Sequence, residues 1–214
     1  MENLSEDRII KDRIEKLEKI RKLNIDPYPS RWISDRKSIK KILDIFIENE
    51  ESENDISSDS FSISGRIMAK RGMGKVVFFD LKDQSGKIQL HYKDEDNEIS
   101  KEFLDLLDIG DIIGVDGVIF RTRRGEITLD LKKIVLLTKS IRPLPDKWSG
   151  LKDNEIRYRQ RYLDLISNDE SKKIAIKRSK IVSSVRNFMN NRGFLEVETP
   201  ILVDIPAGGR AIPF

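Results

Sequence analysis

The fold is decided by the stretch Ala69-Lys-Arg-Gly-Met-Gly-Lys-Val-Val-Phe-Phe-Asp-Leu-Lys-Asp-Gln-Ser-Gly-Lys-Ile-Gln89, a basic glycine loop followed by two short strands. From residue 76 to residue 81 the positions alternate as in a strand that is buried on one face only. Val77 and Phe79 share the face that would form the core, whereas Phe78 shares the other face with Asp80. The sequence therefore predicts a large ring on the wetter face, where it contributes little to the stability of a monomer.

Phe78 has two interpretations from its immediate neighbours alone. A ring beside Arg71 and Lys75 suits stacking on nucleic-acid bases and attraction of phosphates. In the other interpretation the ring packs under the glycine loop and serves only the fold. The stretch by itself favours neither, so both remain open at this point.

The residues around this stretch predict a β-rich α+β fold. Strands are expected at residues 61–70, 75–82, 87–92, 111–121 and 126–137, with a helix at 98–107 between the third and the fourth. Five strands with one helix after the third are typical of an OB-fold barrel. In that fold, strands two and three and the loops between strands one and two and between strands four and five bind nucleic acid.

A protein that reads bases needs a flat stacking surface, hydrogen-bonding groups that match base edges, and positive charge for the backbone. Phe78 provides the first, Gln89 with Glu126 the second, and Arg71 the third. Each residue also has a structural explanation, since Gln89 is an exposed strand position and Glu126 a hairpin charge. Further candidate contacts to the RNA backbone are Lys70, Lys75, Arg121, Arg123 and Arg124.

Composition bounds the class of protein. The 214 residues carry a net charge of only +3, so local clusters of charge rather than the total must support nucleic-acid binding. The chain has no cysteine, and His91 is its only histidine, so we treat His91 as a surface residue and predict no metal site. No apolar run reaches membrane-spanning length, which favours a cytoplasmic protein.

Helices are expected on both sides of the barrel. An amphipathic helix at residues 6–23 has Ile10, Ile14, Leu17 and Ile20 on its apolar face, and a second short helix is expected at 38–48. The proline-containing segment 141–146 is typical of a stiff linker. We therefore divide the chain into an N-terminal helical extension (1–60), the OB-fold (61–140), a linker with an arginine-rich helix (141–166) and the start of another domain (167–214).

The last two segments carry further patterns. The helix expected at 154–166 contains Arg157, Arg159 and Arg161, which suit either RNA phosphates or acidic neighbours. Ser167 and Glu170 form a capping-box pattern before a long helix, and Gly193 stands where a left-handed C-terminal cap would lie. The apolar stripe expected on this helix consists of Ile174, Ile181, Val185 and Phe188. The residues from 194 to 203 alternate as a strand.

Several motifs identify a resemblance. They are Gly65-Arg-Ile-Met, Arg142-Pro-Leu-Pro-Asp-Lys, Arg157-Tyr-Arg-Gln-Arg-Tyr-Leu-Asp-Leu-Ile and Asn191-Arg-Gly-Phe-Leu-Glu-Val-Glu-Thr-Pro. In order and spacing they resemble the N-terminal part of bacterial-type class II lysyl-tRNA synthetases, and the last resembles class II motif 1. The resemblance covers nearly the whole chain.

The resemblance implies an OB-fold that reads the anticodon of tRNA(Lys). Phe78 is similar to the family's ring that stacks on an anticodon base, and Arg71, Gln89 and Glu126 resemble its base-reading partners. In the full-length enzymes, L-lysine is activated with ATP and Mg²⁺ and transferred to tRNA. Motif 1 builds a homodimer interface, which here would involve Phe188, Gly193 and Pro200.

The resemblance also limits the activity that we expect of this chain. The family's motifs 2 and 3 have no match in this chain, so we assign no catalytic residues and expect no lysine activation and no ATP or Mg²⁺ binding by this chain alone. Ala207, Arg210 and Ile212 depart from the family pattern near the bound lysine. The alternatives are a free-standing OB-fold module that binds tRNA or single-stranded nucleic acid, and a truncated or decayed gene product.

Overall fold

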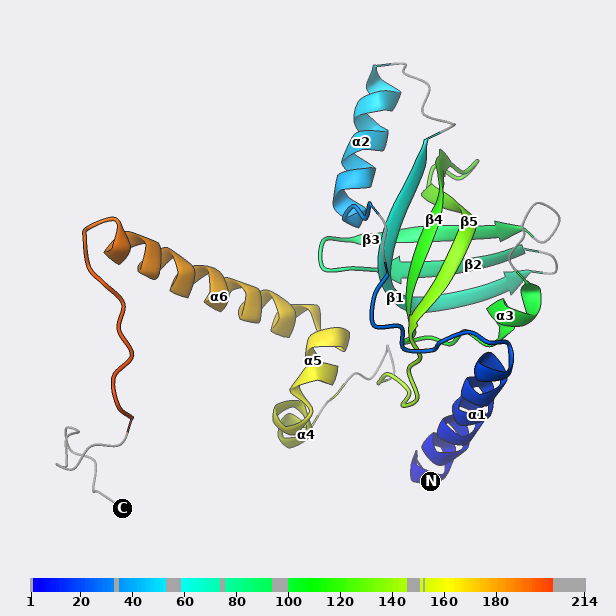
Figure 1. The fold of residues 1–214 in the computed structure, drawn as a ribbon, viewed down its shortest axis with the longest axis horizontal. Coiled ribbons are helices and arrows are strands. Elements are labelled where there is room, and N and C mark those ends of the chain that lie inside the picture. The colour runs from blue at the N-terminus through cyan, green and yellow to red at the C-terminus, as the bar shows by residue number, and fades with distance from the viewer. Residues whose placement is uncertain are drawn as a thin grey trace. The chain divides into compact units, whose positions relative to one another are not determined.

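The computed structural model describes residues 2–32, 35–52, 59–73, 76–93, 100–145, 151 and 153–201 (Figure 1). The chain divides into two compact units, residues 1–144 and residues 145–214. The division falls inside the proline-containing segment at which the sequence predicts a linker. The N-terminal helices belong to the same compact unit as the strands, and the finer division into four segments stays a prediction.

The first unit is built on five strands: β1 (Ser60–Met73), β2 (Val76–Lys82), β3 (Lys87–Lys93), β4 (Ile112–Arg121) and β5 (Ile127–Thr138). They close into a barrel in the order β1-β2-β3-β5-β4, and β4 pairs with β1. Every pairing is antiparallel except that of β3 with β5, which is parallel. Figure 1 shows β2 and β3 crossing β4 and β5, as a barrel requires. The predicted OB-fold is confirmed.

Alternation along the strands fills the barrel. On β2, for example, Val77, Phe79 and Leu81 point inward and are at most 5% exposed. The helix α3 (Lys101–Asp105) lies between β3 and β4, as expected, and adds Phe103 and Leu104 to the same core.

Gly117 marks the place where β4 and β5 approach too closely for a side chain. The register between the two strands shifts at residues 116 and 117. A Cβ atom on Gly117 would lie 2.1 Å from the carbonyl oxygen of Asp130. Glycine is therefore required for this β-bulge to form.

The first helix, α1 (Glu2–Lys22), packs against the barrel differently from the prediction. Leu17 and Ile20 are buried as expected, but Ile14 is 45% exposed and Arg13 is buried. The Arg13 guanidinium donates to the carbonyl oxygens of Ser140, Arg142 and Ile109 at 3.0–3.1 Å. An arginine side chain therefore forms part of the α1 face that contacts the barrel, because these carbonyl oxygens need a hydrogen-bond donor.

A buried ionic cluster lies where α1 meets the barrel. The Lys139 ammonium is fully buried and contacts Asp108 at 2.6 Å and Asp111 at 2.9 Å. Lys16 of α1 also contacts Asp108, at 2.7 Å. Asp111, itself fully buried, accepts hydrogen bonds from the backbone amides of Asp108 and Ser140. These bonds connect α1, the segment before β4 and the end of β5.

We expect this cluster to make the first unit acid-sensitive. Burial alone would raise the pKa of Asp108, but hydrogen bonds from Lys139 and Lys16 outweigh it, so the pKa lies below the ordinary value. A carboxyl group whose pKa is lower in the folded state than in the unfolded state stabilises the fold at pH values above its unfolded-state pKa. This stabilisation is lost as the pH falls through the folded-state pKa. The free energy of unfolding should therefore decline below about pH 4. Urea titrations at several pH values should show a shallower decline for Asp108→Asn, and an identical decline would contradict this assignment.

The second helix, α2 (Ile39–Glu51), buries Ile39, Ile42 and Phe46 against the barrel core. Its first turn is held by two partners. Ser38 accepts from the Lys41 amide, and Asp83 of the β2–β3 turn accepts from the Ile39 amide at 2.9 Å. The helix is thus attached to the turn that joins the two central strands.

The second unit contains α4 (Asn154–Arg159), α5 (Arg161–Ser167) and α6 (Asp169–Asn190). The single helix predicted at 154–166 is broken at Gln160, whose backbone is not helical. The predicted cap at Ser167 is also wrong by one position. Asn168 is the N-cap of α6, because its side-chain oxygen accepts from the amides of Glu170 and Ser171.

The arginines of this unit pair with acidic neighbours, which was one of their two expected roles. Arg157 and Arg161 both contact Asp164, whose side chain is 1% exposed. Arg159 pairs with Glu155 at 2.7 Å. Burial would raise the pKa of Asp164, but hydrogen bonds from Ser171 and Arg157 lower it. The arginine-rich segment therefore holds α4, α5 and the start of α6 together.

The apolar stripe predicted for α6 forms on the helix but remains exposed. Ile174, Ile181, Val185 and Phe188 are between 54% and 64% exposed. Gly193 has a φ of +81°, as its predicted capping position requires. Residues 194–201 form no strand, contrary to the prediction, because no strand of this unit's described residues lies beside them to share hydrogen bonds. Residues 202 and 203, and the departures at Ala207, Arg210 and Ile212, lie outside the described residues.

Among the described helices, none combines the length and the apolar character that crossing a membrane demands.

Candidate nucleic-acid interface

Strand pairing places the predicted site residues on one outer face of the barrel. Arg71 on β1 is paired with Phe78 on β2, and Phe78 is paired with His91 on β3. Gln89, two residues before His91 on the same strand, lies beside Thr128 of β5. Side chains two residues apart on a strand share a face, so these positions form one surface over four strands.

Gln89 and Glu126 meet directly on this face. The Gln89 amide nitrogen donates to the Glu126 carboxylate at 3.0 Å. Its amide oxygen accepts from the Thr128 hydroxyl at 3.1 Å, and Thr128 is fully buried. Both ends of the Gln89 amide are thus oriented, which presents a fixed donor and acceptor edge to a ligand.

Arg71 lies at the other side of Phe78 and is tied to a buried carboxylate. Its guanidinium contacts Asp80 at 2.8 Å, and Lys87 contacts the second oxygen of Asp80 at 2.9 Å. Asp80 is 8% exposed, whereas the Arg71 side chain is 56% exposed. One edge of the guanidinium is therefore anchored, and the group still reaches solvent beside the Phe78 ring.

Three aromatic rings lie side by side on this face, of which sequence reasoning singled out only Phe78. The centroids of Phe78 and His91 are 5.3 Å apart, and those of His91 and Phe120 are 5.7 Å apart. His91 Nδ1 lies 2.8 Å from Asp130 on the neighbouring strand. His91 is thus half-buried between two phenyl rings rather than simply a surface residue. Alternation on β4, where Ile119 is buried, is the sequence signal that places Phe120 on the outer face.

The β4–β5 hairpin that carries Glu126 is attached to α2. Arg121 forms a two-point contact with Glu50 and donates to the Gly125 carbonyl oxygen at 2.7 Å. Its guanidinium carbon also lies 5.7 Å from the centre of the Phe46 ring. Hydrogen bonding from Arg121 lowers the pKa of Glu50. Arg121 therefore holds the hairpin in place, which leaves it less suited to a phosphate than the sequence predicted.

The other residues predicted to contact the RNA backbone are Lys70, Lys75, Arg123 and Arg124, and the structure treats them differently. The Lys70 ammonium donates to the carbonyl oxygens of Leu104 and Leu107, at 2.7 and 3.0 Å, and burial lowers its pKa. It fastens α3 to the barrel, so we leave it out of the contact surface. Lys75 lies outside the described residues. Arg123 and Arg124 are exposed at the tip of the β4–β5 hairpin.

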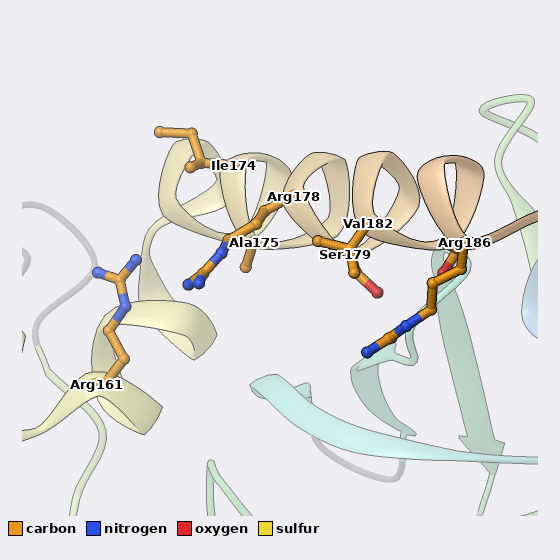
Figure 2. Close-up of a pocket in the computed structure, with 8 residues that line it drawn as sticks. Arg161, Ile174, Ala175, Arg178, Ser179, Val182 and Arg186 are labelled. Carbon is orange, nitrogen blue, oxygen red and sulfur yellow. The ribbon is translucent and has the colours of Figure 1, made fainter. Parts of the chain in front are cut away.

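A groove of about 490 Å³ lies on the second unit, along α6. Figure 2 shows Arg161, Arg178 and Arg186 reaching into it from α5 and α6. Arg161 pairs with Asp164, and Arg186 pairs with Glu196 at 2.9 Å. Because carboxylates neutralise two of the three guanidinium groups, we assign the groove no anionic ligand.

Comparison with known proteins agrees with both units. Residues 61–137 match the family described as OB-fold nucleic acid binding domain, and residues 153–214 match tRNA synthetases class II (D, K and N). Curated relatives named lysine-tRNA ligase include those of Dehalococcoides mccartyi strain BAV1 and Syntrophomonas wolfei. The first is 46% identical over 203 residues, which cover 94% of this chain and 40% of the relative. The second is 44% identical over 213 residues, which cover 99% of this chain and 41% of the relative.

A third relative, the lysine-tRNA ligase of Carboxydothermus hydrogenoformans, is 45% identical over 215 residues, which cover the whole of this chain and 42% of the relative. The chain thus spans about two fifths of the length of the curated relatives it matches. The two family matches follow one another in the order that the motifs predicted. The chain belongs to the lysine-tRNA ligase family of class II aminoacyl-tRNA synthetases and represents its N-terminal portion.

Proposed function

We propose that the outer face of β2, β3 and β5 binds the anticodon loop of tRNA(Lys). The observation that carries this proposal is the oriented Gln89–Glu126 pair, which lies beside an outward-facing ring. In a single-stranded loop of RNA the bases are unpaired and can be splayed out, so their faces and hydrogen-bonding edges become open to a protein. One base stacks on Phe78, while Gln89 and Glu126 read the edges of the bases next to them.

Arg71 supplies the charge in this arrangement. Because Asp80 holds only one edge of the guanidinium, its remaining N–H groups are directed at a base edge or a phosphate beside Phe78. Arg123 and Arg124, at the hairpin tip beyond Glu126, attract the loop backbone. The ring, the hydrogen-bonding pair and the cations thus act on the same short segment of RNA.

The proposal is tested by titrating the chain with a lysine anticodon stem-loop and with a stem-loop of the same composition whose loop is scrambled. We expect clearly tighter binding of the first, because only its bases match the edges that Gln89 and Glu126 present. Equal affinity for both would remove the claim that this face reads the anticodon.

The hairpin arginines and Lys70 should respond differently to salt. Arg123→Gln removes one phosphate contact, so the slope of log K against log salt should become shallower by about 0.7. Lys70→Gln is the matched control, because its ammonium is bonded to carbonyl oxygens of the protein. It should leave the slope unchanged even where it lowers stability. The assignment is wrong if the two variants change the slope alike.

For the full-length protein we propose activation of L-lysine with ATP and Mg²⁺, followed by transfer to tRNA, in the cytoplasm. In the part of the chain described here, no group of three or more histidine, aspartate or glutamate side chains is placed to hold a metal ion. The family's motifs 2 and 3 have no match in this chain, so we derive no step through Mg²⁺ and expect this chain alone to be inactive. Lysine-dependent exchange between ATP and pyrophosphate by this chain would overturn that expectation.

We also propose that α6 and the residues after it form a homodimer interface, with Phe188, Gly193 and Pro200 among the contacts. Support comes from the apolar side chains that α6 leaves exposed, including Phe188 at 54%. Sedimentation of the full-length protein should show a dimer that Phe188→Glu weakens. An unchanged dimer in that variant would place the interface elsewhere.

A further inference from the structure

The Phe78 ring is one end of a longer aromatic row. His91 fills the space between Phe78 on β2 and Phe120 on β4, with centroid distances of 5.3 and 5.7 Å. The three rings are half-buried and lie on the outer face, opposite the core residues of their strands. The core does not require a ring at residue 120, since the neighbouring Ile119 already points inward.

Phe120 lies on the opposite side of the base-reading pair from Phe78. Strand register places Phe120 beside Thr128, and Thr128 beside Gln89. Phe78 lies on β2, next to β3, the strand that carries Gln89. Gln89 therefore lies on a strand between the two strands that carry the phenyl rings, so we expect bases that stack on either ring to approach its oriented amide.

Rigidity and charge favour a nucleobase at Phe120. The His91–Asp130 contact at 2.8 Å fixes the middle ring, so little ordering is needed when a base stacks on the row. The hairpin that follows Phe120 exposes Arg123 and Arg124, which are placed to attract the phosphate of that base. A ring beside exposed cations is the pattern by which single-stranded nucleic acids are held.

We infer that Phe120, with His91 at its edge, forms a second stacking subsite for an unpaired base adjacent to the one that stacks on Phe78. The inference rests on the proposed anticodon binding and deepens it. The surface then holds two neighbouring bases with Gln89 between their stacking positions.

The test compares the full chain with Phe120→Leu, Phe120→Tyr and Phe78→Leu, using the lysine anticodon stem-loop. Phe120→Leu should bind about 5- to 150-fold more weakly, the range typical of one lost base stack. Phe120→Tyr keeps a ring and should retain the affinity. Stem-loops in which each loop base in turn is replaced by an abasic ribose then locate the subsite. One abasic position should weaken the wild type but not Phe120→Leu, and it should neighbour the position coupled to Phe78.

The outcomes separate the two claims. If Phe78→Leu weakens binding and Phe120→Leu does not, the second subsite is wrong and the proposed function stands. If the wild type does not distinguish the cognate loop from a scrambled one, both fail. If Phe120→Leu does not fold, the wild-type protein is tested instead with stem-loops that carry the fluorescent base 2-aminopurine at each loop position in turn. Quenching of its fluorescence on binding then marks the positions that stack on the protein. Quenching at two neighbouring positions is expected, and quenching at only one would overturn the subsite.

Discussion

Replacing Lys139 with Met should lower the free energy of unfolding of the first unit by about 3–5 kcal/mol, the range for breaking a buried ion pair by removing one partner. The Lys139 ammonium lies within 2.9 Å of two carboxylates, and the side chain of Asp111 is 0% exposed. Methionine fills nearly the same volume, so the loss is electrostatic rather than a loss of packing. It leaves Asp111 with its backbone donors but without the ammonium group that contacts it at 2.9 Å.

Lys132→Met is the matched control, because Lys132 lies on the same strand and contacts Asp130 at 2.8 Å with its side chain 48% exposed. An exposed pair of this kind should contribute less than about 1 kcal/mol. Urea titrations followed by circular dichroism compare the two variants. Equal losses would mean that the buried cluster does not stabilise the barrel more than a surface pair does.

Replacing Phe78 with Ala should weaken binding of the lysine anticodon stem-loop by about 1–3 kcal/mol, the usual range for one stacked base. The ring is half-buried on the outer face and touches His91, so its loss also costs some folding stability. Affinities must therefore be measured where the variant is fully folded. Isothermal titration calorimetry at low temperature measures the affinity, and circular dichroism checks that the variant is folded under the same conditions.

Phe79→Leu is the control for Phe78→Ala, because Phe79 is the next residue on β2 but points inward and is 0% exposed. Its replacement should lower stability and leave the affinity of the folded protein unchanged. If Phe78→Ala behaves the same way, then Phe78 is a packing residue and the account of base stacking is wrong.

The barrel and the outward orientation of the candidate site residues could be predicted because both depend on local rules. Successive side chains of a strand point to opposite faces, so the positions of Phe78, Gln89 and Glu126 along their strands assigned their faces without knowledge of the neighbouring strands. The meeting of Gln89 with Glu126 then follows from the strand order of the fold. The parallel pairing of β3 with β5 brings them together although they are far apart in sequence.

Long charged side chains could not be placed in this way. Arg13, Lys70 and Arg121 each leave the position that a surface pattern suggests, because buried carbonyl groups or a carboxylate of another element require a donor. Such partners are brought close only by the tertiary fold. His91 and Phe120 were missed for a related reason. The two rings are adjacent across strands, and the alternation of side chains within one strand does not reveal such neighbours.

The strand expected after Gly193 failed for a different reason. An alternating pattern predicts only that a segment is able to pair, and pairing requires a neighbouring strand. The described residues of the second unit form the helices α4, α5 and α6 and contain no strand that could serve as this neighbour. The stripe on α6 formed as predicted because a helix makes its backbone hydrogen bonds internally.

The central claim, that the outer face of β2, β3 and β5 binds the lysine anticodon loop, is tested most directly by titrating isotope-labelled chain with the stem-loop and following the backbone amide resonances. The account predicts that the largest shifts occur at Arg71, Phe78, Gln89 and Glu126, with the amides of α6 unchanged. Shifts concentrated on α4 to α6, or equal shifts with a scrambled loop, would contradict it.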